Sequence, residues 1–297
     1  MKIGNKKIGY GQPCYIIGEI GINHNGDLDT ALELIRQSAN NGADAVKFQK
    51  RVPEVVTPTE SWNKIRKNTP WGDVKYIDYR RNVEFGEADY SIIDEYCEEV
   101  GIDWFASAWD IESVDFLEKY NVVAHKIASS MLTNIPLVRK IASTGKPIIA
   151  SKGGSTMAEL DKALDIIGRN GENIAILHCV ATYPCPDNKL NLMDIPYLKE
   201  YVAQNYNYAI PVGYSGHEKG LATTVGASVL GARIIERHIT LDRAAWGSDQ
   251  SASVEPQGFA KLIRDIRACE KAMSSGGTGM PQDIELKSIR KLRYFDV

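Results

Sequence analysis

The sequence predicts an α/β protein of the (β/α)8 TIM-barrel class, with a long βα loop after the second strand. Short apolar runs, many of them β-branched, alternate with longer amphipathic stretches along most of the chain. This alternation is typical of repeated βα units around a parallel sheet. There are eight such runs, the number of strands that closes a barrel. The length of 297 residues also suits one barrel, which usually needs roughly 250.

Each predicted strand is a short apolar run that ends in or beside a polar residue. In chain order, the runs cover residues 15–18, 45–48, 103–106, 124–128, 147–151, 174–179, 210–214 and 233–237. The clearest helices between them are predicted at residues 29–40, 91–100, 111–119, 156–169 and 220–230. Asn41-Gly42, Gly101, Asn170-Gly171 and Gly231 follow four of these helices and are typical stop signals.

Residues 51–87 interrupt this rhythm because they are rich in Pro, Trp, Tyr and charge and have no clean period. We interpret them as the extended loop after strand two, which on the catalytic face of a barrel would shape a substrate pocket. Residues 257–273 predict a terminal helix, and residues 274–281 a flexible connector. We therefore assign residues 1–273 to the barrel and 274–297 to a short connector and tail, expected to pack on the barrel or on a partner subunit.

The charge balance excludes some classes of partner. Lys and Arg number 35 and Asp and Glu number 38, for a net charge of -3, so no global basic field attracts nucleic acid or a membrane surface. The N-terminal residues contain no unbroken apolar stretch of signal-peptide length. Five widely spaced cysteines, an odd number, favour reduced thiols and a cytoplasmic location.

Polar side chains gather at the predicted strand ends. Parallel strands of a barrel deliver their last residues to one face, where active sites lie. A whole rim of unpaired buried charge would be too costly for a structural role alone. The convergence therefore predicts an active site that contains Glu19, Lys47, Gln49, Ser107, Lys126, Ser129, Ser151, Tyr183, Ser215, His217, Glu236 and His238. His178 also ends a predicted strand, but it is a weaker candidate that could equally orient a loop.

Two lysines within apolar runs, Lys47 and Lys126, predict a site for a small, multiply charged anion such as a phosphate ester. The hydroxyls of Ser107, Ser129, Ser151 and Ser215 would converge nearby. The structural alternative for either lysine is a snorkelling side chain or an ion pair.

His217 and His238 end neighbouring predicted strands, so both imidazoles can reach one point. With Glu19, Glu236 and Asp249 available, they favour a divalent metal over two structural histidines. A mixed nitrogen and oxygen shell suits Mn2+, Fe2+, Co2+ or Zn2+.

Six motifs, in order along nearly the whole barrel, resemble those of the sialic acid (N-acetylneuraminate) synthase family. They are GEIGINHNGD at 18–27, KFQ at 47–49, KIASS at 126–130, LHCVATYP at 177–184, GYSGH at 213–217 and ERHITLDR at 236–243. The set is far more specific than any single short motif. The chain resembles a short form that lacks the C-terminal antifreeze-like domain many family members carry.

The resemblance implies an enzyme that condenses phosphoenolpyruvate with N-acetylmannosamine or a related amino-sugar aldose and releases phosphate by C–O cleavage. It implies a divalent metal, usually Mn2+, at His217 and His238, catalytic roles for these histidines and Glu19, and a homodimer. Phosphoenolpyruvate would contact Lys47, Ser107, Lys126, Ser129, Ser151 and Ser215, and the acceptor would contact Gln49, Tyr183, Glu236 and Asp249.

The acceptor stays open at this point. Ala181 stands where family members often have Asn, and WGSDQSASVEP differs from the commoner GPDHxxSLEP pattern. A different or phosphorylated aldose is therefore an alternative, for which Arg51, Arg66, Lys75, Arg80 and Arg81 in the long loop supply cations. Alternatives of other classes are a catalytically silent sugar-binding barrel and a metal-dependent hydrolase.

Overall fold

Eight parallel strands pair side by side and close into a barrel in a computed structural model, which describes residues 1–168, 173–206, 210–273 and 279–294. In chain order, they are β3 (Tyr15–Gly21), β4 (Ala45–Lys50), β7 (Asp103–Ala108), β8 (His125–Ile127), β9 (Ile148–Ser151), β10 (Ile174–Cys179), β11 (Val212–Gly216) and β12 (Ile234–His238). Each predicted run overlaps one of these strands, which confirms the predicted (β/α)8 barrel.

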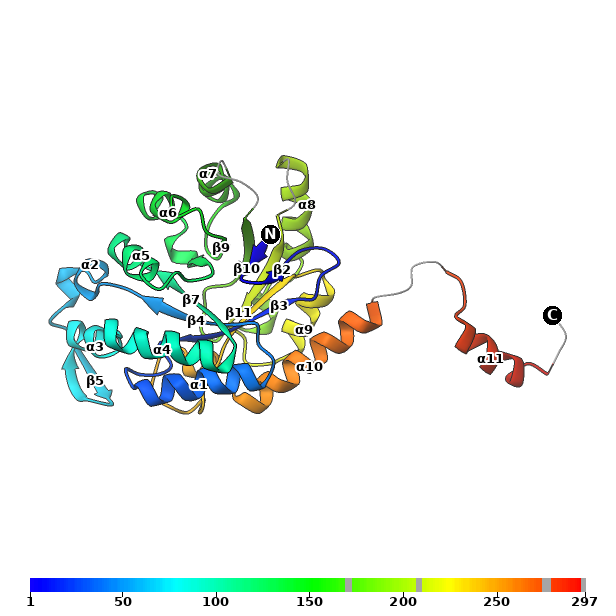
Figure 1. Cartoon of the computed structure of the whole chain (residues 1–297), viewed down its shortest axis with the longest axis horizontal. Coiled ribbons are helices and arrows are strands. Elements are labelled where there is room, and N and C mark those ends of the chain that lie inside the picture. The colour runs from blue at the N-terminus through cyan, green and yellow to red at the C-terminus, as the bar shows by residue number, and fades with distance from the viewer. Residues whose placement is uncertain (169–172, 207–209, 274–278, 295–297) are drawn as a thin grey trace.

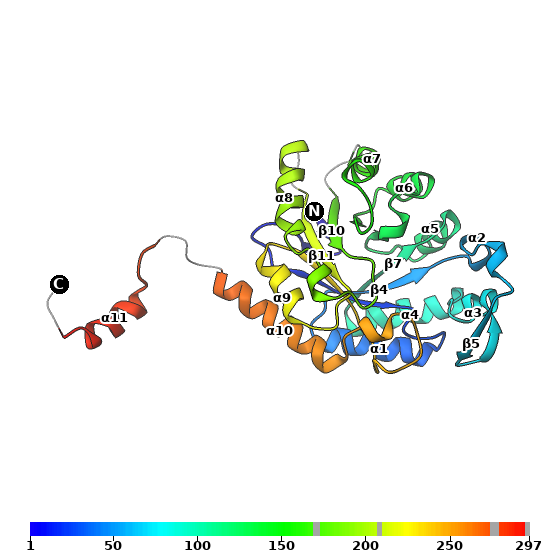
Figure 2. The same cartoon turned by 180° about the vertical axis from the view of Figure 1, so that it is seen from behind.

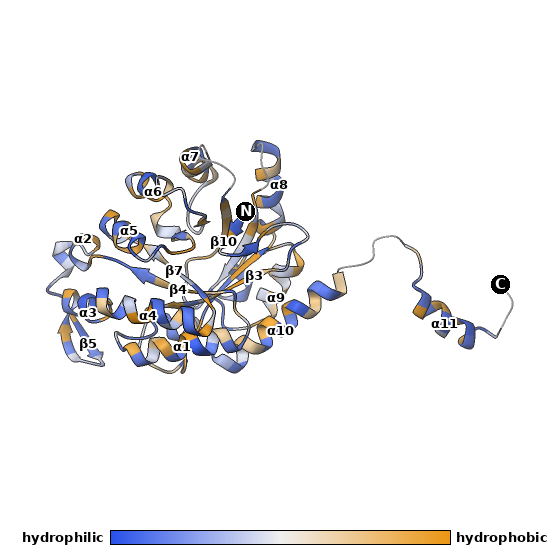
Figure 3. Cartoon of the chain, viewed as in Figure 1, coloured by the Kyte–Doolittle hydropathy of each residue, from blue (hydrophilic) through white to orange (hydrophobic). Residues whose placement is uncertain are grey.

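Helices surround the strands in both views of the molecule (Figures 1 and 2). They are α1 (Leu28–Asn40), α4 (Glu87–Val100), α5 (Ile111–Glu118), α6 (Ile135–Ala142), α7 (Met157–Ile167), α8 (Asp194–Asn205), α9 (Ala222–Val229) and α10 (Pro256–Met273). Figure 3 shows hydrophobic and hydrophilic residues alternating along them. In α1 the buried residues follow the helical period, with Ala31, Leu34, Ile35 and Ser38 facing the barrel.

The predicted helices are confirmed with small shifts at their ends. Helix α4 begins four residues before the prediction because Gly86 precedes it and donates its N–H to Asp89 Oδ2 at 2.8 Å. Helix α6, not among the clearest predictions, is only eight residues long and is capped by Asn134 Oδ1, which accepts the N–H of Leu137 at 3.3 Å. The predicted stop signal Asn170-Gly171 lies outside the described residues.

Strand alternation separates the site from the core. Successive side chains of a strand point to opposite faces. Lys47 and Gln49 therefore share one face of β4. Both of their side chains bond to Glu19, which lies on the neighbouring strand β3. Phe48, between them, packs on the helix side, where its ring centre lies 6.0 Å from that of Tyr90. The same alternation directs polar side chains into the barrel mouth and apolar ones towards the helices.

The long segment between β4 and α4 has regular structure of its own. It contains α2 (Pro53–Val56), a 3-10 turn η1 (Thr59–Ser61), an antiparallel hairpin of β5 (Ile65–Thr69) and β6 (Gly72–Lys75), and α3 (Tyr76–Asn82). These elements lie beyond the arrowhead of β4 in Figure 1. The predicted insertion after strand two is confirmed, but it is a structured extension of the rim rather than an irregular loop.

The two ends of the chain form small elements outside the barrel. The N-terminal residues form a hairpin of β1 (Lys2–Ile3) and β2 (Lys6–Lys7). Near the C-terminus, α11 (Asp283–Leu292) has no buried side chain and stands apart from the barrel in Figures 1 and 2. The expected packing of the tail on its own barrel is thus not seen for residues 279–294, and contact with a partner subunit stays a prediction. Residues 274–278 of the predicted connector lie outside the described residues.

No helix of the described segments combines the length and the apolar character that crossing a membrane requires.

Candidate active site

Lys47 lies at the centre of the polar cluster inside the barrel mouth. Its Nζ is 2.8 Å from Glu19 Oε2 and 3.7 Å from Glu236 Oε2, and it donates to Ser107 Oγ at 3.0 Å. All four residues are buried. Strands β3, β4, β7 and β12 therefore deliver their polar residues to one point.

Glu236 links this point to the second lysine. Its Oε1 lies 3.4 Å from Lys126 Nζ and accepts a hydrogen bond from Ser215 Oγ at 2.9 Å. Burial alone would raise the pKa of Glu236, but Lys126 and Lys47 outweigh burial and lower it to about 2. The two predicted lysines thus lie on the same rim, with an ionised carboxylate between them.

Glu19 differs from Glu236 in its ionisation. Burial raises the pKa of Glu19 to about 7, Lys47 opposes this rise, and the charge of Glu236 adds to it. Two neighbouring carboxyls with pKa values on opposite sides of the ordinary value are typical of sites that transfer protons. Glu19 is the member of the pair able to gain and lose a proton near neutral pH.

His217 and His238 lie side by side at the same mouth, with ring centres 5.7 Å apart. Burial lowers the pKa of His217 to about 4, with a further contribution from His238, and burial also lowers the pKa of His238. Both imidazoles are therefore neutral at pH 7, which is the form that binds metals. The Nδ1 atom of His217 lies 2.8 Å from Val180 O, so its Nε2 is the nitrogen left for a ligand.

The donor set fits a divalent metal only in part. The buried Nδ1 of His238 has no hydrogen-bond partner within the described segments, as expected of a nitrogen that awaits a ligand. Across the described part of the chain, no group of three or more His, Cys, Asp or Glu side chains is arranged to hold a metal. Two imidazoles would hold an ion only with further ligands from substrate or water.

Two of the predicted phosphoenolpyruvate contacts lie after β8 and at the end of β9. Ser151 Oγ is buried and has no hydrogen-bond partner in the described structure, so it can bind a ligand. Ser129 begins the 3-10 turn η2 (Ser129–Met131) directly after β8 and hydrogen-bonds with the thiol of Cys179. Ser129 therefore already has a partner, unlike Ser151.

The predicted acceptor contacts extend from the polar cluster towards solvent. Gln49 Nε2 donates to Glu19 Oε1 at 3.2 Å, and the ring of Tyr183 lies 4.1 Å from that of His217. Burial raises the pKa of Tyr183 and lowers that of His238, and Asp249 adds to the first shift and opposes the second. Asp249 therefore lies within electrostatic range of both.

His178 is the exception among the residues that the sequence predicts for the site. Its Nε2 lies 2.7 Å from Leu190 O and its Nδ1 3.8 Å from Asp194 Oδ2, so it faces the helix layer and orients the loop before α8. The other predicted site residues lie at or beside this mouth.

Sequence reasoning missed the ion pair behind the histidines. Glu218 directly follows His217, and Arg237 directly precedes His238. Arg237 Nη1 lies 3.1 Å from Glu218 Oε1. Tyr214 Oη donates to Glu218 Oε2 at 2.8 Å. The sequence did contain a signal for this pair. Arg237 stands between Glu236 and His238, which face the barrel interior, so its side chain must point into the helix layer, where a buried charge needs a partner.

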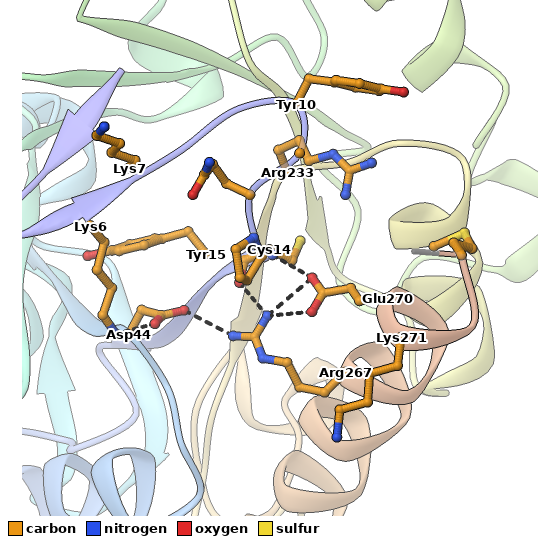
Figure 4. Close-up of a pocket in the computed structure, with 14 residues that line it drawn as sticks. Lys6, Lys7, Tyr10, Cys14, Tyr15, Asp44, Arg233, Arg267, Glu270 and Lys271 are labelled. Atoms are coloured by element: carbon orange, nitrogen blue, oxygen red, sulfur yellow. Dashed lines mark hydrogen bonds and ion pairs between the residues drawn. The ribbon is translucent and has the colours of Figure 1, made fainter. Parts of the chain in front are cut away.

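A wide hollow of about 1050 Å³ lies at the other end of the barrel, beside the start of β3 and the residue before β12. Figure 4 shows its main charged network. Arg267 Nη1 lies 3.0 Å from Glu270 Oε2 and donates to Cys14 O at 2.8 Å, and Arg267 Nη2 lies 3.4 Å from Asp44. These contacts fix α10 to the N-terminal rim, where side chains of a barrel generally contribute to stability rather than catalysis.

Known proteins resemble the chain in both sequence and structure. The N-acetylneuraminate-9-phosphate synthase of Homo sapiens is 39% identical over 269 residues, which cover 90% of this chain and 73% of that protein. The N,N'-diacetyllegionaminic acid synthase of Campylobacter jejuni is 35% identical over 265 residues, covering 88% and 78% of the two chains. The crystal structure of an N-acetylneuraminic acid (sialic acid) synthetase from Leptospira borgpetersenii in complex with citrate superposes with a TM-score of 0.85 at 32% identity, covering 98% and 95%.

The motif resemblance to sialic acid synthases is therefore confirmed over most of the chain. The model of the NeuB family matches residues 34–278, a range that includes every predicted site residue except Glu19, which precedes it. With relatives above 30% identity over most of its length, this chain belongs to the NeuB family.

Proposed function

We propose that the chain condenses phosphoenolpyruvate with N-acetylmannosamine or a related amino-sugar aldose, to form N-acetylneuraminate or a related nonulosonic acid with release of phosphate. The observation that carries this proposal is the meeting of Lys47, Lys126 and Glu19 around Glu236. The names of the relatives, which are synthases of such acids, support the same reaction.

Phosphoenolpyruvate would bind at the two lysines. Lys47 and Lys126 carry two buried positive charges, and Glu236 neutralises one of them. When Glu19 is protonated, which its pKa of about 7 allows near neutral pH, the cluster retains net positive charge for an anion. Ser107, Ser129, Ser151 and Ser215 would add hydroxyl donors to the phosphate or the carboxylate.

The acceptor aldehyde would lie towards His217 and His238. We propose that these neutral imidazoles hold a divalent ion, most simply Mn2+, completed by substrate or water. When bound, such an ion polarises a carbonyl oxygen as a Lewis acid. Gln49, Tyr183, Glu236 and Asp249 would orient the sugar around the aldehyde.

The reaction uses Glu19 to move a proton. Carbon three of phosphoenolpyruvate forms a bond to the aldehyde carbon, whose oxygen takes the proton of protonated Glu19 and becomes a hydroxyl, and carbon two becomes cationic. Water adds to carbon two, and ionised Glu19 accepts a proton from that water. The hydroxyl proton of the tetrahedral adduct then passes to the phosphate, which leaves by cleavage of its bond to carbon two, and a ketone remains.

We also propose that the protein is a cytoplasmic homodimer. The dimer rests on the family resemblance and on the exposed apolar side chains of α11, where Ile284 and Leu292 are 70% and 75% exposed. The five cysteines are all free thiols, which suits a reducing compartment.

The test is to incubate the purified protein with phosphoenolpyruvate, Mn2+ and a panel of aldoses, and to measure phosphate release and product mass. We expect phosphate and a nonulosonic acid in equal amounts with at least one amino-sugar acceptor. Absence of turnover with every acceptor would overturn the proposed reaction and favour the alternative of a catalytically silent sugar-binding barrel.

Two histidine variants test the metal. His217→Ala and His238→Ala should each lose both turnover and Mn2+ binding measured by calorimetry. His125→Gln is the matched control, because His125 Nε2 is buried against Glu118 at 2.8 Å on the helix side of the barrel. Full activity in either site variant would contradict the metal assignment.

A further inference from the structure

Two arginines of the insertion after β4 lie against the same aromatic ring. Arg66 comes from β5 and Arg80 from α3, and their guanidinium carbons lie 4.1 Å and 5.8 Å from the ring centre of Tyr79. Arg66 is also 4.9 Å from the ring centre of Trp246, and Arg80 is 5.2 Å from that of Tyr76. The aromatic rings fix the two positive charges in place.

Neither guanidinium has a carboxylate within 4.0 Å in the segments that the structure describes. The Nε atom of Arg80 is buried and has no hydrogen-bond partner there. The next residue differs, because Arg81 pairs with Glu54 at 2.7 Å and with Asp78 at 3.0 Å. Arg80 acts electrostatically on Glu84, but that carboxylate is already paired with Arg51 at 2.8 Å. The two cations near one ring therefore still repel each other, and a bound anion would lower that cost.

The other cations of the insertion are not available in the same way. Arg51 Nε lies 2.8 Å from Glu84 Oε1, and its guanidinium also donates to Gln49 and lies 4.8 Å from the Trp109 ring. Lys75 ends β6 and is exposed. The insertion therefore offers Arg66 and Arg80 as a pair that an external anion can bridge.

The pair lies beside the proposed acceptor site. Trp246 stands three residues before Asp249 in the loop after β12, and its carbonyl oxygen accepts a hydrogen bond from Asn25 Nδ2 at 2.7 Å. Burial lowers the pKa of Arg51, and the charges of both Arg80 and Asp249 also act on this guanidinium. Arg51 in turn contacts Gln49, which bonds to Glu19. Arg80 is thus connected to Glu19 through Arg51 and Gln49, and it lies at the outer end of this series of contacts.

We propose that Arg66 and Arg80 bind a phosphate monoester on the acceptor, at the end of the sugar remote from its aldehyde. This inference rests on the proposed function, whose acceptor it restricts to a phosphorylated amino-sugar aldose. Guanidinium groups bind phosphate oxygens by paired, charge-assisted hydrogen bonds. Tyr79 contacts both arginines and Trp246 contacts Arg66, so this cluster on the rim would select for a charged acceptor.

The test compares N-acetylmannosamine with its phosphate monoester as acceptors, by kcat/KM at saturating phosphoenolpyruvate. The wild type should prefer the monoester by roughly ten-fold or more, the effect of one or two charge-assisted hydrogen bonds. Arg66→Met and Arg80→Met should each lower this ratio about ten-fold, towards equal use of the two acceptors. Arg81→Met, whose side chain already has acidic partners, is the matched control and should leave the ratio unchanged.

A binding measurement separates this inference from the proposed reaction. Calorimetry without phosphoenolpyruvate should show tighter binding of the monoester than of the plain sugar in the wild type, and this difference should disappear in Arg80→Met. Equal binding of both sugars by the wild type would overturn the inference even if condensation occurs. Tighter monoester binding without turnover would support the arginine pair and overturn the proposed reaction. Arg80→Lys, which retains the charge, should keep part of the preference.

Discussion

Arg237 and Glu218 form an ion pair in which neither side chain reaches solvent, with Nη1 and Oε1 3.1 Å apart. Arg237 Nη1 also donates to Thr224 Oγ1 at 2.6 Å and to Gly220 O at 2.9 Å. Because the two residues adjoin His238 and His217, the pair joins the two strand ends that carry the imidazoles.

Removing one member of this pair should strongly destabilise the protein. Arg237→Met leaves the Glu218 carboxylate buried without its counter-charge, at an expected cost of about 3–5 kcal/mol. Urea denaturation measures the free energy of unfolding. The double variant Arg237→Met with Glu218→Leu should recover part of the loss, since no charge is then left behind. A single-variant loss below about 1 kcal/mol would contradict the account.

Gly21 tests how closely the catalytic groups approach each other. Its φ is +56°, and a Cβ there would lie 3.1 Å from Gln49 Nε2, 3.2 Å from Glu19 Oε1 and 3.3 Å from His238 Cε1. Gly21→Ala should therefore lower kcat roughly ten-fold or more, because small displacements of positioned groups are costly.

A matched control separates crowding from backbone strain. Gly101 has a φ of +72°, and a Cβ added to it would meet nothing within 4 Å, so Gly101→Ala carries the strain without the contacts. Both variants should lose about 1–2 kcal/mol of stability, and only Gly21→Ala should lose activity. Equal kcat values for the two variants would show that the absence of a side chain at Gly21 is not needed to position Glu19, Gln49 and His238.

Glu19 predicts a pH dependence of stability. Burial raises its pKa from 4.5 to about 7, although Lys47 opposes the shift. Below pH 4.5 the carboxyl is protonated in both states. As pH rises towards 7, the unfolded chain releases the proton while the folded chain retains it, so the stabilising contribution is lost. The unfolding free energy of Glu19→Gln relative to wild type should therefore rise between pH 5 and pH 8.

Chemical denaturation at both pH values measures this difference. Glu98→Gln, on the exposed side of α4, is the matched control for loss of one carboxyl. A difference between Glu19→Gln and wild type that stays constant, or falls with pH, is incompatible with a raised pKa for Glu19.

Lys126 should contribute mainly to phosphoenolpyruvate binding. Lys126→Met removes one of the two buried ammonium groups that meet Glu236, and the Kd should rise roughly 10- to 100-fold. Calorimetry with phosphoenolpyruvate alone measures this effect. Lys146→Met is the matched control, because Lys146 Nζ binds Val122 O at 2.9 Å away from the mouth. An unchanged Kd in Lys126→Met would remove this lysine from the anion site.

The barrel and its polar rim were predictable because of one geometric rule. Parallel strands bring their carboxyl ends together, so polar residues that follow apolar runs, such as Lys47 and His238, had to meet. The rule does not say which of them touch. Glu236 was predicted as an acceptor contact, and it lies between Lys47 and Lys126. Contacts across a barrel depend on strand stagger, which local sequence does not specify.

The insertion was less predictable for a different reason. Its hairpin strands carry mostly exposed residues, as in β5, where only Thr69 is buried, so no apolar alternation marks them. The association of Arg66, Arg80 and Tyr79 depends on the hairpin folding against α3. Such long-range packing has no signal in residue spacing alone.

The most direct measurement of the central claim uses phosphoenolpyruvate labelled with a heavy oxygen isotope at its bridging position. The labelled compound is incubated with the protein, Mn2+ and the amino-sugar acceptor, and both products are analysed by mass spectrometry. Attack of water on carbon two predicts that the label leaves with phosphate and that a nonulosonic acid forms in equal amount. Label retained in the sugar acid, or phosphate released without any sugar acid, would contradict the account.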